Sequence, residues 1–62
     1  MEIKLARIKK NLTQKELAEK LGVTPQYLRL IELDKIDIKK SLMIKLSMIL
    51  EISIQDLFFK ED

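Results

Sequence analysis

Apolar residues along this chain recur at intervals of three and four residues, the spacing that places them on one face of an α-helix. Alternation at intervals of two, which would indicate β-strands, is weak. Five helices are expected, at residues 2–10, 13–21, 24–34, 40–50 and 53–59. The connections between them are two to five residues long, as between helices that pack against one another. The pattern therefore predicts a compact all-α fold.

Two of these helices begin at a capping-box sequence. Thr13 and Glu16 have the T-x-x-E spacing, in which each side chain can bond to a backbone N–H group at the helix start. Ser53 and Asp56 repeat the arrangement before the last helix. Both signals favour helix starts at residues 13 and 53.

Other boundaries carry residues with special backbone preferences. Thr24 followed by Pro25 indicates a third start, because proline is tolerated at the first helical position, where its missing N–H group has no partner anyway. Gly22 and Asn11 can adopt the left-handed conformation that ends a helix at low cost. We therefore expect the first two helices to end at these residues.

A chain of 62 residues is expected to form one domain, 1–62, near the lower size limit for independent folding. Its core would contribute roughly 3–5 kcal/mol to stability. The expected core residues are the apolar side chains at helix-spaced positions: Ile3, Leu5, Ile8, Leu17, Ala18, Leu21, Val23, Leu28, Ile31, Leu42, Leu46, Ile49, Leu50, Ile52 and Leu57.

The composition excludes several kinds of site. The chain has no cysteine and no histidine, so disulfides, thiolate metal sites and catalytic pairs that need Cys or His are excluded. A domain this small rarely encloses a substrate pocket. We therefore expect no enzyme activity, no catalytic residue, no metal, no cofactor and no small-molecule ligand.

Charge and hydropathy say less about function. The formal net charge of +2 does not by itself indicate nucleic-acid binding. Residues 1–10 carry four basic side chains against one acidic, and residues 56–62 carry one basic against three acidic. The apolar runs are too short for a membrane span or a signal peptide. A cytoplasmic protein without membrane contact is expected.

The second and third expected helices, joined at Gly22, have the proportions of a helix-turn-helix. Ala18 is small where the two helices would cross, and Val23 can fill the corner. A corner between two helices of any small bundle has the same features. The pattern therefore leaves a DNA-binding interpretation and a purely structural one open.

Three segments carry more specific motifs. LTQKELAEKLGVT contains T-Q-x-x-L-A-x-x-x-G-V-[ST], IELDK is similar to I-E-x-G-x, and LSMILEISIQDLF is similar to L-A-x-x-L-x-[VI]-[ST]-x-x-x-L-[FL]. Through them, the chain from Leu5 to Phe58 resembles the phage Cro and repressor-type helix-turn-helix family, also called the lambda-repressor-like domain. The resemblance implies a five-helix domain that binds double-stranded DNA sequence-specifically, as a prokaryotic or phage transcriptional regulator, in particular a repressor.

Three positions depart from the family pattern. Asp34 replaces the usual glycine after the third helix, Asn11 stands at a position that is often glycine, and Ser47 replaces the usual alanine in the fourth helix. Asp tolerates the left-handed conformation at some cost. None of the three lies on the surface that the resemblance assigns to DNA, so the predicted fold is unaffected.

The resemblance also implies an ion pair between the first and third helices. Its two positions are Arg7 and Glu32 in this sequence. A partly buried pair of this kind would hold the first helix against the helix that reads DNA. The alternative is two exposed charges that do not meet.

Contacts to the DNA backbone are expected at helix starts. At Gln14 the positive end of the helix dipole, backbone N–H groups and the side-chain amide can meet one phosphate. Capping alone already explains the two threonines among the candidates, and Lys9 and Lys10 are weaker candidates. The residues expected to contact phosphate are Thr13, Gln14, Thr24, Tyr27, Lys35 and Lys40.

The family's base-reading positions are Pro25, Gln26 and Leu30 in this sequence. Helical spacing turns Gln26, Arg29, Leu30 and Leu33 away from the core. Glutamine can pair with adenine, and leucine or proline can pack on a thymine methyl group, whereas Arg29 can reach a guanine or a phosphate. An operator half-site rich in A·T pairs is therefore expected. For Leu33 we prefer partial burial against the loop before the fourth helix.

Two-fold operators imply two-fold protein dimers, so a homodimer is expected, at least on DNA. The candidate interface residues are Ile54, Phe58 and Phe59, of which Phe58 is expected to cap the core. An alternative function is a protein-interaction module on the same fold, such as an adaptor or an antitoxin. Leu30 and Leu33 on the outer face are the residues that favour this alternative.

Overall fold

The computed structural model describes residues 3–59. This part of the chain forms α-helices and no β-strand, so the all-α prediction is confirmed. The predicted boundaries are correct to within two residues, except that the predicted start at residue 2 lies outside the described residues. The helices are α1 (Ile3–Lys9), α2 (Gln14–Leu21), α3 (Pro25–Glu32), α4 (Lys40–Leu50) and α5 (Ile54–Phe58).

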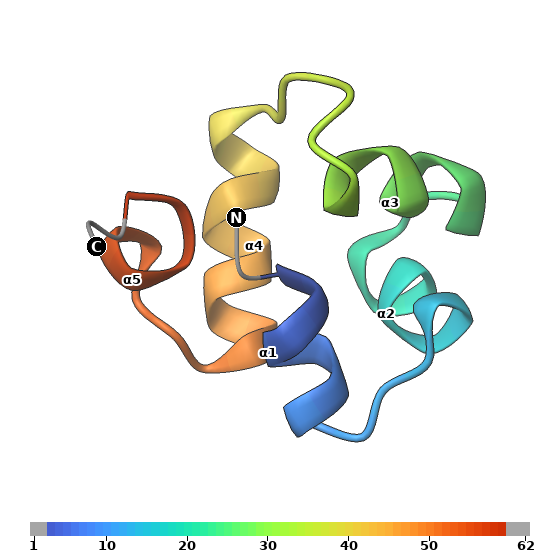
Figure 1. The fold of residues 1–62 in the computed structure, drawn as a ribbon, viewed down its shortest axis with the longest axis horizontal. Helices are drawn as coiled ribbons and strands as arrows, with labels where there is room; N and C mark the ends of the chain where they lie inside the picture. The colour runs from blue at the N-terminus through green and yellow to red at the C-terminus, as the bar shows by residue number, and fades with distance from the viewer. Residues whose placement is uncertain (1–2, 60–62) are drawn as a thin grey trace.

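Helix α4 runs through the middle of the molecule (Figure 1). Helices α2 and α3 lie on one side of it and α5 on the other, and α1 lies in front of its lower end. Helix α2 packs against both α3 and α4, and α4 also packs against α5. The long helix therefore connects the helix pair α2–α3 to the end of the chain.

The predicted start signals form caps at α3 and α5. The Thr24 Oγ1 atom accepts a hydrogen bond of 3.1 Å from the Tyr27 N–H group, and Pro25 occupies the first helical position. At α5, the Ser53 Oγ atom accepts a bond of 3.1 Å from the Asp56 N–H group. The reciprocal bond to the Asp56 carboxylate does not form among the described residues, so α5 has only half of the predicted capping box.

Four described residues have positive φ angles: Asn11 (59°), Gly22 (80°), Asp34 (59°) and Glu51 (57°). The left-handed conformations predicted for Asn11 and Gly22 are confirmed. Asp34 adopts the conformation expected of the family's usual glycine, and its short polar side chain tolerates it.

Glu51 was not expected to be left-handed, and a neighbouring serine explains how the turn there is held. The Ser47 hydroxyl donates to the Ile52 carbonyl oxygen at 2.6 Å, and the Ile52 N–H group donates to the Ser47 carbonyl oxygen at 3.1 Å. These two bonds close the chain around Glu51, between α4 and α5. The departure from the family's usual alanine at Ser47 therefore has a structural role.

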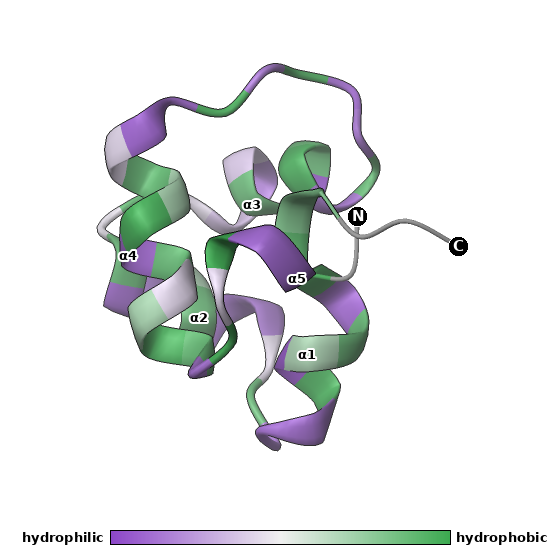
Figure 2. Ribbon diagram, turned by 90° about the vertical axis from the view of Figure 1, so that its left-hand side faces the viewer, coloured by the Kyte–Doolittle hydropathy of each residue, from purple (hydrophilic) through white to green (hydrophobic). Residues whose placement is uncertain are grey.

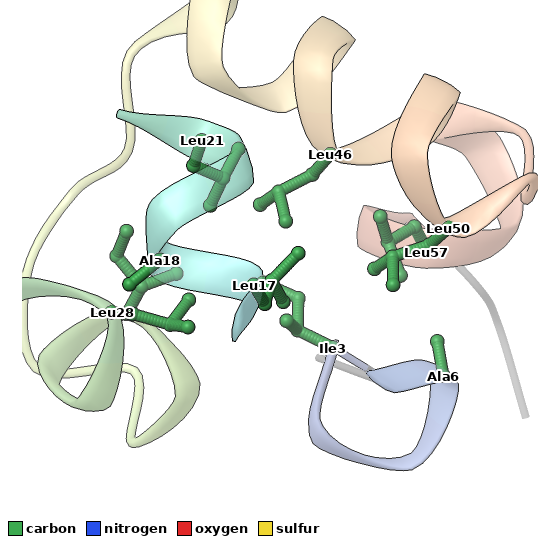
Figure 3. Packing of buried hydrophobic residues seen from close by; sticks show 10 residues of the cluster. Ile3, Ala6, Leu17, Ala18, Leu21, Leu28, Leu46, Leu50 and Leu57 are labelled. Carbon is green, nitrogen blue, oxygen red and sulfur yellow. The ribbon is translucent and has the colours of Figure 1, made fainter. Parts of the chain in front are cut away.

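The core lies between the helices, and all five contribute side chains to it (Figure 3). Its fully buried apolar residues are Ile3, Ala6, Leu17, Ala18, Leu21, Leu28, Ile31, Leu46, Leu50 and Leu57. Partly buried residues pack around them: Leu12, Val23, Tyr27, Ile36, Ile38, Leu42, Ile49, Ile52 and Phe58. The predicted core is confirmed except at two positions in α1.

The prediction that Leu5 and Ile8 belong to the core is wrong. Their side chains are 55% and 50% exposed, whereas Ile3, Ala6 and Arg7 face inward. At 100° per residue, Leu5 and Ile8 lie opposite the inward residues of the same helix. Helix α1 buries only one side, and beside Ile3 that side carries a small alanine and a charged arginine, which a pattern of large apolar residues does not include.

The prediction that Leu33 is partly buried is also wrong, since its side chain is 52% exposed. Helix α3 ends earlier than predicted, and residues 33–39 form a longer loop than expected. Figure 2 shows hydrophilic and hydrophobic residues interspersed along this loop. Ile36 and Ile38 pack against the core.

Candidate nucleic-acid interface

The turn between α2 and α3 brings the two helices into close contact. The N–H group of Gly22 donates to the carbonyl oxygens of Ala18 and Glu19 at 2.9 and 3.2 Å, and Val23 N–H donates to Ala18 at 3.0 Å. These bonds form the Schellman-type ending that a left-handed glycine permits. Ala18 is fully buried, so a small residue lies where the two helices meet. The pair has the form of a helix-turn-helix.

The capping box predicted at the start of α2 is formed. Thr13 Oγ1 accepts from the Glu16 N–H group at 3.0 Å, and Glu16 Oε1 accepts from the Thr13 N–H group at 2.8 Å. The bond from the Thr13 backbone lowers the pKa of Glu16 below its ordinary value of 4.5. Within residues 3–59, the N–H groups of Gln14 and Lys15 have no acceptor, as is usual in the first turn of a helix. These two donors point out of the helix start.

An ion pair connects α1 to the end of α3. Arg7 Nε lies 2.7 Å from Glu32 Oε2, and Arg7 Nη2 lies 3.4 Å from Glu32 Oε1. Arg7 Nη1 also donates to the Leu12 carbonyl oxygen at 2.9 Å. The structure thus brings together the two residues expected to pair, and both side chains are largely buried.

Gln14 is joined to this ion pair. Its Nε2 atom donates to Glu32 Oε1 at 2.9 Å, which links the first residue of α2 to the last residue of α3. The motif indicated a place for Gln14 at a helix start, but no spacing rule connected it to Glu32, eighteen positions later. This contact was missed at the level of sequence because it depends on how α2 and α3 cross.

The outward side of α3 carries most of the expected base-reading residues. Pro25, Gln26 and Arg29 are exposed. Leu30, which was expected to face outward, is half-buried. The chain turns just after α3, where Lys35 N–H donates to the Leu30 carbonyl oxygen at 3.0 Å. Periodicity gives the side of a helix on which a residue lies and not how far its neighbours cover it, so it overstated the exposure of Leu30.

A shallow groove joins the start of α3 to the start of α4. Its volume is about 360 Å³, and its lining residues are Val23, Thr24, Tyr27, Lys39 and Leu42. Tyr27 is half-buried and packs against the core. The groove therefore places two residues expected to contact phosphate, Thr24 and Tyr27, beside the first turn of α4.

The start of α4 differs from the other capped starts. Lys39 is its N-cap and forms no side-chain cap, so the N–H groups of the first turn have no side-chain acceptor. Lys39 and Lys40 are both exposed. Farther along α4, Lys45 Nζ donates to the Leu21 carbonyl oxygen at 3.3 Å and so ties α4 to α2. The sequence indicated Lys40 but missed Lys39, although the lack of a capping residue before Lys40 was a visible signal.

The remaining candidates are more dispersed. Lys35 is exposed in the loop after α3. Lys10 forms an ion pair with Glu51 and lowers the pKa of that carboxyl, so it is engaged away from the α2–α3 corner. At α5, Ile54 and Phe58 are half-buried, and Phe58 packs against the core as expected. Phe59, just after α5, is 56% exposed.

Neither metal binding nor membrane insertion is indicated in the part of the chain that the structure describes. No group of three or more acidic, histidine or cysteine side chains there is arranged to hold a metal ion. Each helix between residues 3 and 59 lacks the length and apolar character that crossing a bilayer requires. The arrangement instead presents hydrogen-bond donors at both ends of α3.

Comparison with known proteins agrees with this geometry. Residues 3–57 match the model of the helix-turn-helix family. The chain is also 39% identical over 61 residues to an uncharacterized HTH-type transcriptional regulator of Methanocaldococcus jannaschii. That alignment covers 98% of this chain and 92% of the relative. The chain therefore belongs to the Cro/repressor-type helix-turn-helix family, whose members are DNA-binding proteins and not enzymes.

Proposed function

We propose that this protein is a sequence-specific regulator that binds an operator in double-stranded DNA through α3 and represses transcription. The observation that carries the proposal is the position of uncommitted donors at both ends of α3. The hydrogen bond between Gln14 and Glu32 brings the start of α2 to one end of α3, and the groove between Thr24 and Lys39 brings the start of α4 to the other. Such donors suit a DNA backbone on each side of a groove.

The first set of backbone contacts would come from the start of α2. The free N–H groups of Gln14 and Lys15 lie where the helix dipole favours an anion. Thr13 Oγ1 already accepts a bond in the capping box, and its hydroxyl hydrogen remains available as a donor to phosphate. This set would fix the register of α3 on the duplex.

The second set would come from the groove and the start of α4. Thr24 and Tyr27 offer hydroxyl groups there, and Lys39 and Lys40 offer charge. Lys35, in the preceding loop, extends the same basic group of residues. The missing side-chain cap leaves the first-turn N–H groups of α4 open to phosphate oxygens.

Base reading would fall to the exposed start of α3, the part of a recognition helix that contacts base edges. Gln26 can donate to and accept from adenine, and Pro25 can pack on a thymine methyl group. Arg29 would reach a guanine or a phosphate. Leu30 is half-buried, so it would contribute only its exposed atoms to a thymine contact. The set favours a half-site rich in A·T pairs.

A homodimer on DNA would place two such helices on one operator. The longest dimension of the described residues is 29 Å. For comparison, the two half-sites of such an operator lie about 34 Å apart, one turn of B-DNA. Phe59 is the most exposed of the proposed interface residues, and Ile54 and Phe58 add partly exposed surface beside it.

Selection of bound sequences from a random duplex pool at physiological salt tests the proposal. An enriched A·T-rich inverted repeat is expected, and the spacing of its halves would report the dimer. Gln26→Ala should relax the preference at one base pair of each half, whereas Gln55→Ala, an exposed glutamine in α5, should leave it unchanged. No enrichment by a folded protein would refute operator binding.

One observation favours a second function, a protein-interaction module such as an adaptor or antitoxin. Leu33 is 52% exposed at the end of α3, close in sequence to the proposed DNA-reading residues. The two functions differ in their salt dependence. Binding through several phosphates weakens steeply as ionic strength rises, whereas an apolar protein contact does not.

A further inference from the structure

We infer that Arg7 and Glu32 act as positioning residues for Gln14, so that two side chains largely inaccessible to DNA control how well the start of α2 holds a phosphate. The inference rests on the proposed function, because it assumes that Gln14 meets the DNA backbone. The side chains of Arg7 and Glu32 are only 11% and 3% exposed. Gln14 is half-buried, so it is more accessible than the two residues of the pair, and it is bonded to Glu32.

The chemistry of Glu32 determines which end of the Gln14 amide faces inward. An ionised carboxylate only accepts hydrogen bonds, whereas a glutamine amide has two N–H donors at one end and a carbonyl oxygen at the other. With Gln14 Nε2 2.9 Å from Glu32 Oε1, one N–H group is used by the carboxylate and the second remains available. Turning the amide over would bring two acceptors together. Glu32 therefore keeps a donor at this site.

Arg7 holds both parts of this arrangement in place. It fixes the carboxylate through the 2.7 Å contact between its Nε atom and Glu32 Oε2. It also fixes the backbone just before the capping residue of α2, through the 2.9 Å bond from Nη1 to the Leu12 carbonyl oxygen. In addition, the positive charge of Arg7 offsets the negative charge of Glu32, which would otherwise repel a phosphate bound nearby. One side chain thus orients the amide and the N–H groups beside it.

A double-mutant cycle on DNA affinity tests the inference. Binding of a labelled duplex carrying the selected operator would be measured by fluorescence anisotropy for the unmodified protein, Gln14→Ala, Glu32→Gln and the double variant. Gln14→Ala is expected to weaken binding about tenfold in the unmodified background. In the Glu32→Gln background the same change should alter affinity less than about twofold, because the amide is no longer held in one orientation.

Two controls separate positioning from general structural damage. Gln55→Ala, on the exposed side of α5, should change affinity in neither background. In the unmodified protein, one proton of the Gln14 side-chain amide should exchange slowly with solvent and resonate outside the range of an exposed amide such as that of Gln55. Both amide protons of Gln14 should shift when the duplex is added. This second measurement holds even if Glu32→Gln does not fold, and Gln14 resonances that coincide with those of Gln55 would overturn the inference.

The outcomes of the cycle are distinct. An equal loss of affinity from Gln14→Ala in both backgrounds would show that Gln14 acts without Glu32 and would overturn the inference alone. If Gln14→Ala lowers the affinity for DNA in neither background, Gln14 does not contact the duplex, and the inference is overturned as well. If the unmodified, folded protein binds no duplex, the proposed function fails and the inference fails with it.

Discussion

Replacing Arg7 by methionine is expected to reduce the free energy of unfolding by about 3 kcal/mol. Methionine keeps a long unbranched stem but removes every donor of the guanidinium group. Glu32, whose side chain is 3% exposed, would then retain only the bond from Gln14 and would lose its counter-charge. The perturbation therefore leaves a buried carboxylate without its partner, which costs much more than removing an exposed pair.

The magnitude follows from the bonds that are lost. The 2.7 Å bond between Arg7 Nε and Glu32 Oε2 is charge-assisted, and such bonds contribute about 1.5–3 kcal/mol. The bond from Nη1 to the Leu12 carbonyl oxygen adds about 1 kcal/mol. The contact between Nη2 and Glu32, at 3.4 Å, adds little. A domain of this length has a total stability of roughly 3–9 kcal/mol, so the substitution should remove at least about a third of it.

Urea unfolding followed by circular dichroism at 222 nm measures this loss. Arg29→Met is the matched control, because Arg29 is exposed and forms no ion pair with any described residue, and it should change stability by less than about 0.5 kcal/mol. Adding Glu32→Leu to Arg7→Met should recover at least half of the loss, because the unpaired charge is then gone. A change for Arg7→Met no larger than that for Arg29→Met would refute the reasoning.

The other predictions concern a cap and the core. NMR titration should give a pKa below 4.5 for Glu16 in the folded protein. Because folding lowers this pKa, the stabilisation from the ionised carboxylate is present above pH 4.5 and is lost as the pH falls through the folded-state pKa. A pKa at or above 4.5 would contradict the capping box. Leu17→Ala should cost about 3 kcal/mol in urea unfolding, whereas Leu5→Ala should cost less than about 0.5 kcal/mol, and equal losses would contradict the orientation of α1.

The local features of this fold are predictable because the groups that form them are close in sequence. The Thr13 cap, the left-handed Gly22 and the start of α3 at Pro25 each depend on atoms within a few residues of one another. The left-handed conformation of Asp34 could be anticipated as well, because glycine usually occupies that position in the family. The side of α1 that is buried, by contrast, was not predicted correctly at Leu5.

The candidate interface divides in the same way. The motif identified Gln14, Gln26 and Lys40 because each stands at or near a helix start. It did not identify Lys39, which lines the groove between α3 and α4. It overstated the exposure of Leu30, which is half-buried. It also contained no sign that Gln14 and Glu32 share a hydrogen bond. Each of these depends on the placement of one helix or loop against another.

By itself, the sequence determined the helical class, the five segments, the N-terminal caps of α2 and α3 and the helix-turn-helix corner, because periodicity and capping are properties of short segments. The tertiary structure alone decided which apolar residues are buried. In α1, Ala6 and Arg7 lie inside while Leu5 lies outside, because only one side of that helix meets its neighbours. The same packing brings Arg7, Glu32 and Gln14 together from three different helices. Contacts between distant segments depend on crossing geometry, and the residues of one helix do not specify it.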